Sequence, residues 1–217
     1  MVARKTKKRS SRNLPRRRRD IDLPEALLAA TESILREHGL EKFTLREAAR
    51  RAGVSHGAPA FHFGDVSGLL TAFAAGGYKG MTALMVKYRD AAAKDPSSQL
   101  VAVGSAYIDY AIAHRPQFQL MFRSDSIRLD DEAYKECSKD AFHQLQETMM
   151  PFLGPDSTDQ QRKLKLLLAW SAVHGFATLV LEKRFSGFYG EERNPPVSVD
   201  GREMLAMLTA SFERKAA

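Results

Sequence analysis

The stretch TLREAARRAGVSHGAPAFHFGD, residues 44–65, decides the fold, because two short helical segments flank a glycine turn within it. Thr44 can cap the first segment, and Glu47 three residues later completes a capping box. Gly53 ends that segment after barely two turns. Ser55 is a good N-cap for the second segment. The pattern predicts a helix-turn-helix, whose second helix enters the major groove of DNA.

Two helix breakers, Gly57 and Pro59, stand at the start of the second short helix. The backbone N–H groups of a first helical turn are unpaired anyway, so both residues cost less there than in a helix interior. We expect a slightly irregular start, because Pro59 does not occupy the first helical position. Phe61 and Phe63 lie two residues apart and cannot share one helical face. One is expected to pack inward and the other to lie near the helix end or the DNA.

Helical spacing extends over the rest of the chain after residue 22. Apolar residues recur three and four apart from Ala26 to Leu35, and Gly39 suits the end of that first helix. Asp65 is expected to cap a long helix that runs to about Ala93. We find no strand-like alternation and no internal repeat, so the sequence predicts an all-α fold. About nine helices are expected. The later helices begin at about residues 100 and 116 or extend over residues 130–150, 158–185 and about 205–212. Breaks between helices are expected at residues 95–99, 151–158 and 186–201.

The positive charge of the chain is concentrated at its N-terminus. Residues 1–19 hold ten lysines and arginines, including Arg16, Arg17, Arg18 and Arg19, and no acidic residue. The whole chain carries a net charge of +7, so the remaining residues sum to −3. So polar a segment cannot bury enough apolar surface to fold alone. It is either a solvated leader or, as its position next to the first helix favours, an arm that follows DNA phosphates.

Composition and patterning point to a globular protein of the cytoplasm. Hydrophobic residues make up 44% of the chain and charged residues 27%, and the one cysteine, Cys137, cannot form an internal disulfide. No secretory signal fits the N-terminus. Residues 166–181 contain no Asp, Glu, Lys or Arg, but these 16 residues fall short of a membrane span, which needs about 20. We therefore expect a helix buried on most sides inside the protein, and no membrane association.

A set of regularly placed residues between 24 and 75 resembles the DNA-binding domain of the TetR family of transcriptional regulators. The match spans about fifty residues, and its members are Gly39–Leu40, Thr44, Ala48–Ala49, Gly53–Val54–Ser55, His62–Phe63 and Leu69–Leu70. Trp170, His174 and Gly175 also resemble a Trp-x-x-x-His-Gly signature in the C-terminal domain of one branch of that family. The resemblance implies a helix-turn-helix domain over 20–66 and a larger helical ligand-binding and dimerisation domain over 67–217. The charge pattern adds a disordered basic arm over 1–19.

The resemblance also implies which residues meet DNA. The groove-facing part of the second short helix carries His56, Gly57, Ala58 and Ala60. His56 can donate a hydrogen bond to guanine, and the small residues can contact thymine methyl groups. Thr44, Arg46 and His62 are candidates for contacts with the DNA backbone, although His62 can equally pack at the helix end. Arg50 and Arg51 fit a solvated helix face better than a DNA contact. The candidate DNA-contacting set is Thr44, Arg46, Ser55, His56, Gly57, Ala58, Ala60, Phe61 and His62, with Arg16, Arg17, Arg18 and Arg19 in the arm.

Two departures from the family pattern remove phosphate contacts. Ala60 stands where members commonly have a tyrosine, and Val66 stands where they commonly have a lysine. Residues 20–64 also hold five lysines and arginines against seven acidic residues. Because phosphate neutralisation supplies much of DNA affinity, the domain alone should bind weakly at physiological salt, and the arm is expected to offset the loss.

The last two helices are apolar beyond a single stripe. Residues 166–181 are apolar nearly all round, and Met204 and Met207 flank Leu205 and Leu208. A four-helix interface made from two copies of each helix would bury these surfaces. The sequence therefore predicts a homodimer, which suits a palindromic operator because a two-fold protein reads two half-sites.

The family resemblance implies a small-molecule effector inside the larger helical domain, whose binding releases the protein from DNA. Repression is the family's usual mode and is expected here on that ground alone. Trp170 and His174 share a helical face and carry polar atoms that need partners when buried. The alternative is that these aromatics are plain core, with His174 a satisfied core histidine. The candidate lining residues are Tyr107, Tyr110, Phe118, Met121, Phe122, Trp170, His174 and Phe176.

Two other classes of protein compete with a regulator. An enzyme is disfavoured, because the sequence lacks Glu-x-x-His, His-Glu-x-x-His, P-loop and Gly-x-Ser-x-Gly motifs, and Cys137 lies in a charged run. A helical ligand carrier without DNA activity is disfavoured by the basic arm and the helix-turn-helix. We expect no catalytic residue, no cofactor and no metal site.

Overall fold

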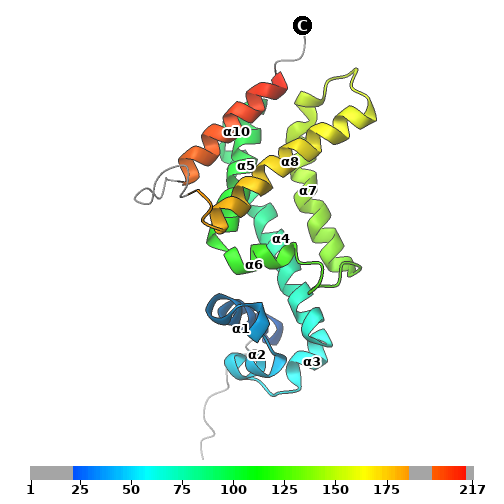
Figure 1. The fold of residues 1–217 in the computed structure, drawn as a ribbon. Helices are drawn as coiled ribbons and strands as arrows, with labels where there is room; N and C mark the ends of the chain where they lie inside the picture. The colour runs from blue at the N-terminus through cyan, green and yellow to red at the C-terminus, as the bar shows by residue number, and fades with distance from the viewer. Residues whose placement is uncertain (1–21, 186–196, 214–217) are drawn as a thin grey trace, which may run out of the picture.

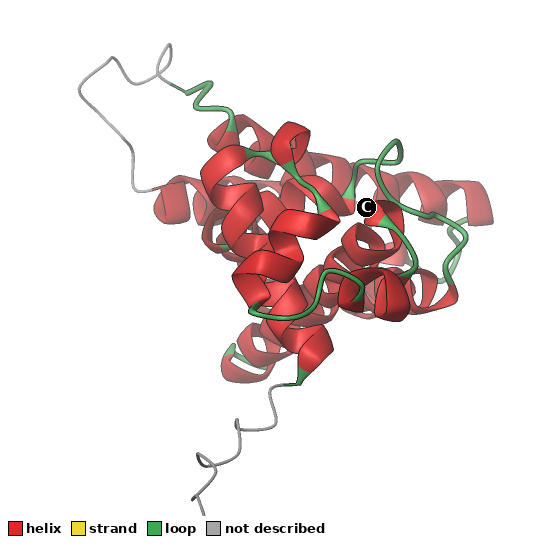
Figure 2. Cartoon of the chain, turned by 90° about the horizontal axis from the view of Figure 1, so that it is seen from below, coloured by secondary structure: helices red, strands yellow, loops and turns green. Residues whose placement is uncertain are grey.

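The chain folds into two groups of helices joined by one long helix (Figure 1). The structure, a computed structural model, describes residues 22–185 and 197–213. Within those ranges there are nine α-helices, one short 3-10 helix and no strand, and Figure 2 shows them joined by loops, so the all-α prediction is confirmed. The elements are α1 (Leu23–His38), η1 (Leu40–Lys42), α2 (Leu45–Ala52), α3 (Ala58–Phe63), α4 (Val66–Ala91), α5 (Pro96–Ala113), α6 (Arg115–Met121), α7 (Glu132–Leu153), α8 (Asp159–Leu181) and α10 (Val197–Glu213).

Helices α1, α2 and α3 form a small head at one end of the molecule, opposite α10 (Figure 1). The head closes around Leu27 and Ile34 of α1 and Ala48 of α2, all of which are fully buried. Leu69, in the first turns of α4, joins the same apolar cluster. Helix α4 then continues for 26 residues and packs against α5 and α7, so one rigid element links the head to the helical bundle.

The predicted helix caps are confirmed at α2 and α4. The Thr44 hydroxyl accepts the N–H of Glu47 at 3.2 Å, and the Asp65 carboxylate accepts the N–H of Gly68 at 2.9 Å. The predicted capping box at Thr44 is wrong, because the Glu47 carboxylate is bound by arginine side chains instead. Charge-assisted bonds of that kind are stronger than a bond to a neutral backbone N–H.

The prediction that Ser55 caps α3 is wrong. Helix α3 begins at Ala58 with Gly57 as its N-cap, and a turn closed by the Ala58 N–H and the Ser55 carbonyl at 3.1 Å precedes it. A helix capped by Ser55 would place Pro59 beyond the first turn, where its ring clashes with the carbonyl four residues earlier. The later start puts Pro59 inside the first turn, where a proline is tolerated.

Four other predicted boundaries shift. Helix α5 already begins at Pro96 with Asp95 as its cap, and α8 ends at Leu181 rather than 185. Helix α10 begins at Val197, inside the break predicted over 186–201. Helix α7 continues to Leu153 although it contains Pro151. Phe152 and Leu153 are buried in a second apolar cluster beside α8 and α10. Burying two such side chains is worth about 1.5–3 kcal/mol each, enough to offset the roughly 3 kcal/mol cost of an interior proline.

Helix α8 is not buried on most sides, contrary to the sequence prediction. Its buried residues Ala169, Val173, Ala177 and Leu181 lie four apart and form one stripe, because only one side of the helix faces the bundle. By length and composition, α4 and α8 pass as membrane-crossing candidates among the described residues, with 56% and 22% of their most apolar windows buried. For α4 the burial is that of a core helix, whereas α8 leaves most of its apolar surface uncovered.

Candidate functional site

The predicted DNA-contacting residues of the folded domain lie together on the outer edge of the head. Thr44 is the N-cap of α2 and Arg46 lies in its first turn, while the turn before α3 supplies three residues and α3 supplies the rest. Ala58 is half-buried. The others are exposed: Thr44, Arg46, Ser55, His56, Gly57, Ala60, Phe61 and His62. The predicted arm, with Arg16 to Arg19, lies outside the described residues. Contact of these residues with DNA stays a prediction.

Helix α3 has a clear inner and outer side. Pro59 is buried and Phe63 packs against the head's apolar cluster, whereas Phe61 is 85% exposed. The expectation that one phenylalanine packs inward and the other faces outward is therefore confirmed. The exposed ring of His62 lies 5.2 Å from the Phe61 ring and 6.3 Å from the Phe63 ring, between centroids, so His62 is not part of the core.

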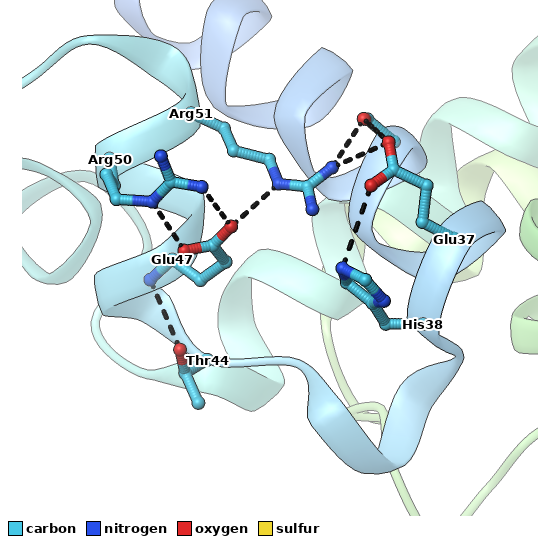
Figure 3. Close-up of polar contacts among 7 residues, drawn as sticks. Glu37, His38, Thr44, Glu47, Arg50 and Arg51 are labelled. Atoms are coloured by element: carbon cyan, nitrogen blue, oxygen red, sulfur yellow. Dashed lines mark hydrogen bonds and ion pairs between the residues drawn. The ribbon is translucent and has the colours of Figure 1, made fainter.

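Arg51 fastens α2 to α1 (Figure 3). Its guanidinium donates to the Glu47 carboxylate at 2.8 Å and to the Ser33 hydroxyl at 2.8 Å, and it pairs with Glu37 at 2.8 Å. Only 16% of the Arg51 side chain is exposed, so the solvated-face interpretation is wrong for this residue. It fits Arg50 better, because that side chain is 67% exposed although it also binds Glu47.

The side chains of this network are ionised at neutral pH. Hydrogen bonds from Arg50 and then Arg51 lower the pKa of Glu47 to about 2. The hydrogen bonds to Glu37 and Glu47 in turn raise the pKa of Arg51 above its ordinary value. The angle between α1 and the helix-turn-helix is thus held by ionised groups rather than by apolar packing alone.

An apolar cavity of about 440 Å³ lies in the helical bundle between α4, α5, α7, α8 and α10. Three of the predicted lining residues border it: Tyr107, Phe122 and Trp170. Among the described residues of its wall, Lys139 alone is charged. The full lining is Tyr78, Met85, Leu100, Val103, Gly104, Tyr107, Phe122, Tyr134, Ser138, Lys139, Ala141, Phe142, Leu145, Ala169, Trp170, Val173, Leu205, Leu208, Thr209 and Phe212.

Sequence reasoning missed two tyrosines in the cavity wall. The hydroxyls of Tyr78 and Tyr134 both donate to the carbonyl oxygen of Met121, at 3.3 and 2.8 Å. The signal was available, because each tyrosine lies on the apolar face of a predicted helix, where a phenol needs a partner. Burial raises the pKa of Tyr78, so its hydroxyl stays protonated.

The five remaining predicted ligand residues do not line this cavity. His174 and Phe118 border a separate groove of about 870 Å³ between α1, α6 and the end of α8. His174 still touches the cavity wall, because its Nδ1 lies 2.7 Å from the Tyr107 hydroxyl, and burial lowers the His174 pKa and keeps the ring neutral. Tyr110 donates to Gln117 and Met121 is fully buried, so both are core residues here. Phe176 is half-buried against the same cluster, with its ring 5.3 Å from that of Phe185 between centroids.

The loop after α6 ties the bundle to the start of α4, a contact that the sequence did not predict. The Arg128 guanidinium pairs with the Asp65 carboxylate at 2.8 Å, and the Arg128 N–H donates to the Thr71 hydroxyl at 2.8 Å. Ser67 donates to the carbonyl of Ser126 at 3.3 Å. Since Asp65 directly follows α3, the bundle contacts the base of the candidate DNA-reading helix.

Comparison with known proteins places both halves of the chain in one family. Residues 27–73 match the model described as "Bacterial regulatory proteins, tetR family", and residues 100–200 match "Tetracyclin repressor-like, C-terminal domain". The HTH-type transcriptional regulator BetI of Burkholderia ambifaria is 39% identical over 83 residues, which are 38% of this chain and 43% of that protein. The chain therefore matches less than half the length of this curated relative.

Solved structures of similar fold extend over nearly the whole chain. A Rhodococcus sp. RHA1 protein of unknown function is 27% identical, with a TM-score of 0.71, over 92% of this chain and 97% of that one. The TetR-family transcriptional regulator PfmR from Thermus thermophilus shares the fold with a TM-score of 0.60 and 16% identity, over 85% and 97% of the two chains. Together the two family models cover more than half of the sequence, and the chain belongs to the TetR family of bacterial regulatory proteins.

Proposed function

We propose that the protein is a dimeric transcriptional repressor that binds a palindromic operator and leaves it when a small molecule fills the bundle cavity. The observation that carries the proposal is α4, one helix that begins at the base of α3 and lines the cavity with Tyr78 and Met85. A ligand that changes the position of α4 would change the position of the head. Such coupling requires only that ligand and DNA prefer different conformers. The family consists of non-enzymatic regulators, which argues against an enzyme.

The cavity supports an apolar or amphipathic effector. Its volume of about 440 Å³ falls within the usual range of small-molecule sites, roughly 300–1,000 Å³. The phenol hydrogens of Tyr78 and Tyr134 are already donated to Met121, so their oxygens remain as acceptors for a ligand hydroxyl. A fixed buried charge is absent from the described wall, since Lys139 is exposed at its edge. The interior thus favours an uncharged body.

The surface of α8 supports dimerisation. Leu164, Leu168 and Leu179 lie on the side opposite the buried stripe and are exposed in the single chain. A side chain added at Gly175, on that same side, would meet nothing within 4 Å. Helix α10 packs beside α8 and exposes Met207. Two copies of α8 and α10 would cover this apolar surface and place two heads on two half-sites.

DNA binding is tested by fluorescence anisotropy on duplexes flanking the protein's own gene, with heparin as competitor. We expect the complex with one duplex to persist at an excess of heparin that dissociates complexes with random DNA. If no duplex is preferred over random DNA, the regulatory function is refuted.

The effector site is tested with paired tryptophan variants on α7. Compounds that raise the melting temperature of the wild type and lower its DNA affinity are selected first. Ala141→Trp places an indole in the cavity, since Ala141 is buried in its wall, and should abolish both effects while leaving DNA binding intact. Ala133→Trp puts the same ring on the exposed side of α7 and should leave both effects unchanged. An unaltered ligand response in Ala141→Trp would place the effector elsewhere.

A further inference from the structure

The outward ring of Phe61 has no structural use within the described chain. At 85% exposure it is the most exposed large apolar side chain of the described residues, ahead of Met207 at 74%. It lies opposite the side of α3 that carries the buried Pro59 and the inward Phe63. Among the described residues, its ring contact is with the neighbouring His62, which is also exposed. An apolar ring held out on a DNA-binding head is therefore a candidate recognition group.

Helix α3 and the turn before it are short of the groups that usually read bases. Between residues 55 and 63 there is no arginine, lysine, asparagine, glutamine, aspartate or glutamate. The exposed side chains are Ser55, the imidazoles of His56 and His62, the methyl group of Ala60, and Phe61. Bidentate hydrogen bonds to guanine or adenine, which need a guanidinium or an amide, are therefore not available from α3. The remaining major-groove feature that apolar groups recognise is the 5-methyl group of thymine.

We propose that Phe61, with the methyl group of Ala60, recognises thymine 5-methyl groups in the major groove of the operator. This inference rests on the proposed function and adds the chemistry of base recognition to it. Ala60 leaves the space that a larger residue would fill, so the backbone can approach the bases closely. Each contacted methyl group contributes by removing apolar surface from water, as any buried methyl group does.

Deoxyuridine isolates this contribution, because it differs from thymidine only by the missing methyl group. The preferred duplex is first selected from a random-sequence library, and each thymine is then replaced singly by uracil. At one or more positions in each half-site, we expect uracil to weaken binding by about three- to tenfold. Phe61→Ala should bind the thymine and uracil duplexes equally at those positions. Its melting temperature should equal that of the wild type, since the ring is 85% exposed and contacts only the exposed ring of His62 among the described residues.

Met150→Ala is the matched control, because it also removes an exposed apolar side chain but from α7 in the bundle. It should keep the wild-type ratio of thymine to uracil affinity. Sequence-selective binding with equal affinities for every thymine and uracil pair would refute methyl recognition while leaving the regulator intact. Retention of the ratio in Phe61→Ala would refute the assignment to this residue. Failure to bind any selected duplex would instead refute the proposed function.

Discussion

Glu47 is the side chain on which the charges of the head converge. Its two carboxylate oxygens accept three hydrogen bonds from Arg50 and Arg51, at 2.7, 2.7 and 2.8 Å. Arg51 carries the connection on to Glu37 in α1. The geometry of the head therefore depends on Glu47 being ionised.

Acid should weaken the head through Glu47. Its pKa is lowered from 4.5 to about 2 in the folded protein, chiefly by hydrogen bonding to Arg50, so its contribution is complete above about 4.5 and is lost as the pH falls toward 2. Glu47→Gln should therefore melt below the wild type at pH 7, and the two curves should converge near pH 2. Thermal unfolding followed by circular dichroism across this range measures the difference. Glu41→Gln, an exposed carboxylate in η1, should match the wild type at pH 7. A gap between wild type and Glu47→Gln that persisted at pH 2 would contradict this account.

At the scale of the element, the turn between α2 and α3 depends on a left-handed glycine. Gly53 has φ +69° and ψ +29°, and its N–H reaches the carbonyls of Ala49 and Arg50. Gly57 stands at the start of α3 with φ −82°. A Cβ at either position would meet no atom within 4 Å, so the two glycines differ in backbone conformation and not in available space.

The matched pair Gly53→Ala and Gly57→Ala separates conformation from packing. Gly53→Ala should lower stability by about 1 kcal/mol, because an L-residue in the left-handed region is strained. That loss corresponds to a fall in Tm of about 2–4 °C for a chain of this size. Gly57→Ala should stay within about 1 °C of the wild type, since its φ suits any residue. Equal melting temperatures for the two variants, measured by differential scanning calorimetry, would show that the αL position is not strained.

Local signals explain which elements were predictable from the sequence. Thr44, Gly53 and Asp65 act on neighbouring backbone groups, so the start and end of α2 and the start of α4 could be predicted. The start of α3 depends on a steric conflict at Pro59, which helix propensities do not describe. Helix α7 continues beyond Pro151 because the burial of Phe152 and Leu153 offsets the free-energy cost of an interior proline.

Individual residues of the candidate site could be predicted from the sequence, but the contacts between residues of different helices could not. Tyr107, Phe122 and Trp170 could be named because large aromatic residues at helical spacing are conspicuous in a sequence. Of the three, only Tyr107 is buried, and Trp170 is 39% exposed, so the expectation that Trp170 is buried is wrong. The cavity draws on helices from α4 to α10, and no spacing rule relates them. The same holds for Arg51 and Arg128, whose partners lie on elements that only the tertiary fold brings near.

At the scale of the whole molecule, the uncovered apolar side of α8 is the surface that needs a partner. Apolar patches larger than a few hundred Å² are rare on monomers and usually mark an interface. The long apolar run of this helix and its low burial support the proposed dimer, in which a second copy of the chain would pack on the leucines opposite the buried stripe. In that arrangement the monomer is an incomplete reader, because each head reaches only one half-site.

A charge placed in that surface should therefore dissociate the dimer and lower its affinity for the operator. Leu168 is 52% exposed in the single chain, and Leu168→Asp would bury an unpaired carboxylate at the centre of the interface. Light scattering after size exclusion should give the monomer mass for this variant, and operator affinity should fall by well over tenfold as the second half-site is lost. Leu129→Asp is the control, since Leu129 is 51% exposed but lies in the loop before α7. It should stay dimeric and bind DNA as the wild type does. If Leu168→Asp keeps the dimer mass at micromolar concentration, the interface lies on another surface and the heads are spaced by other contacts.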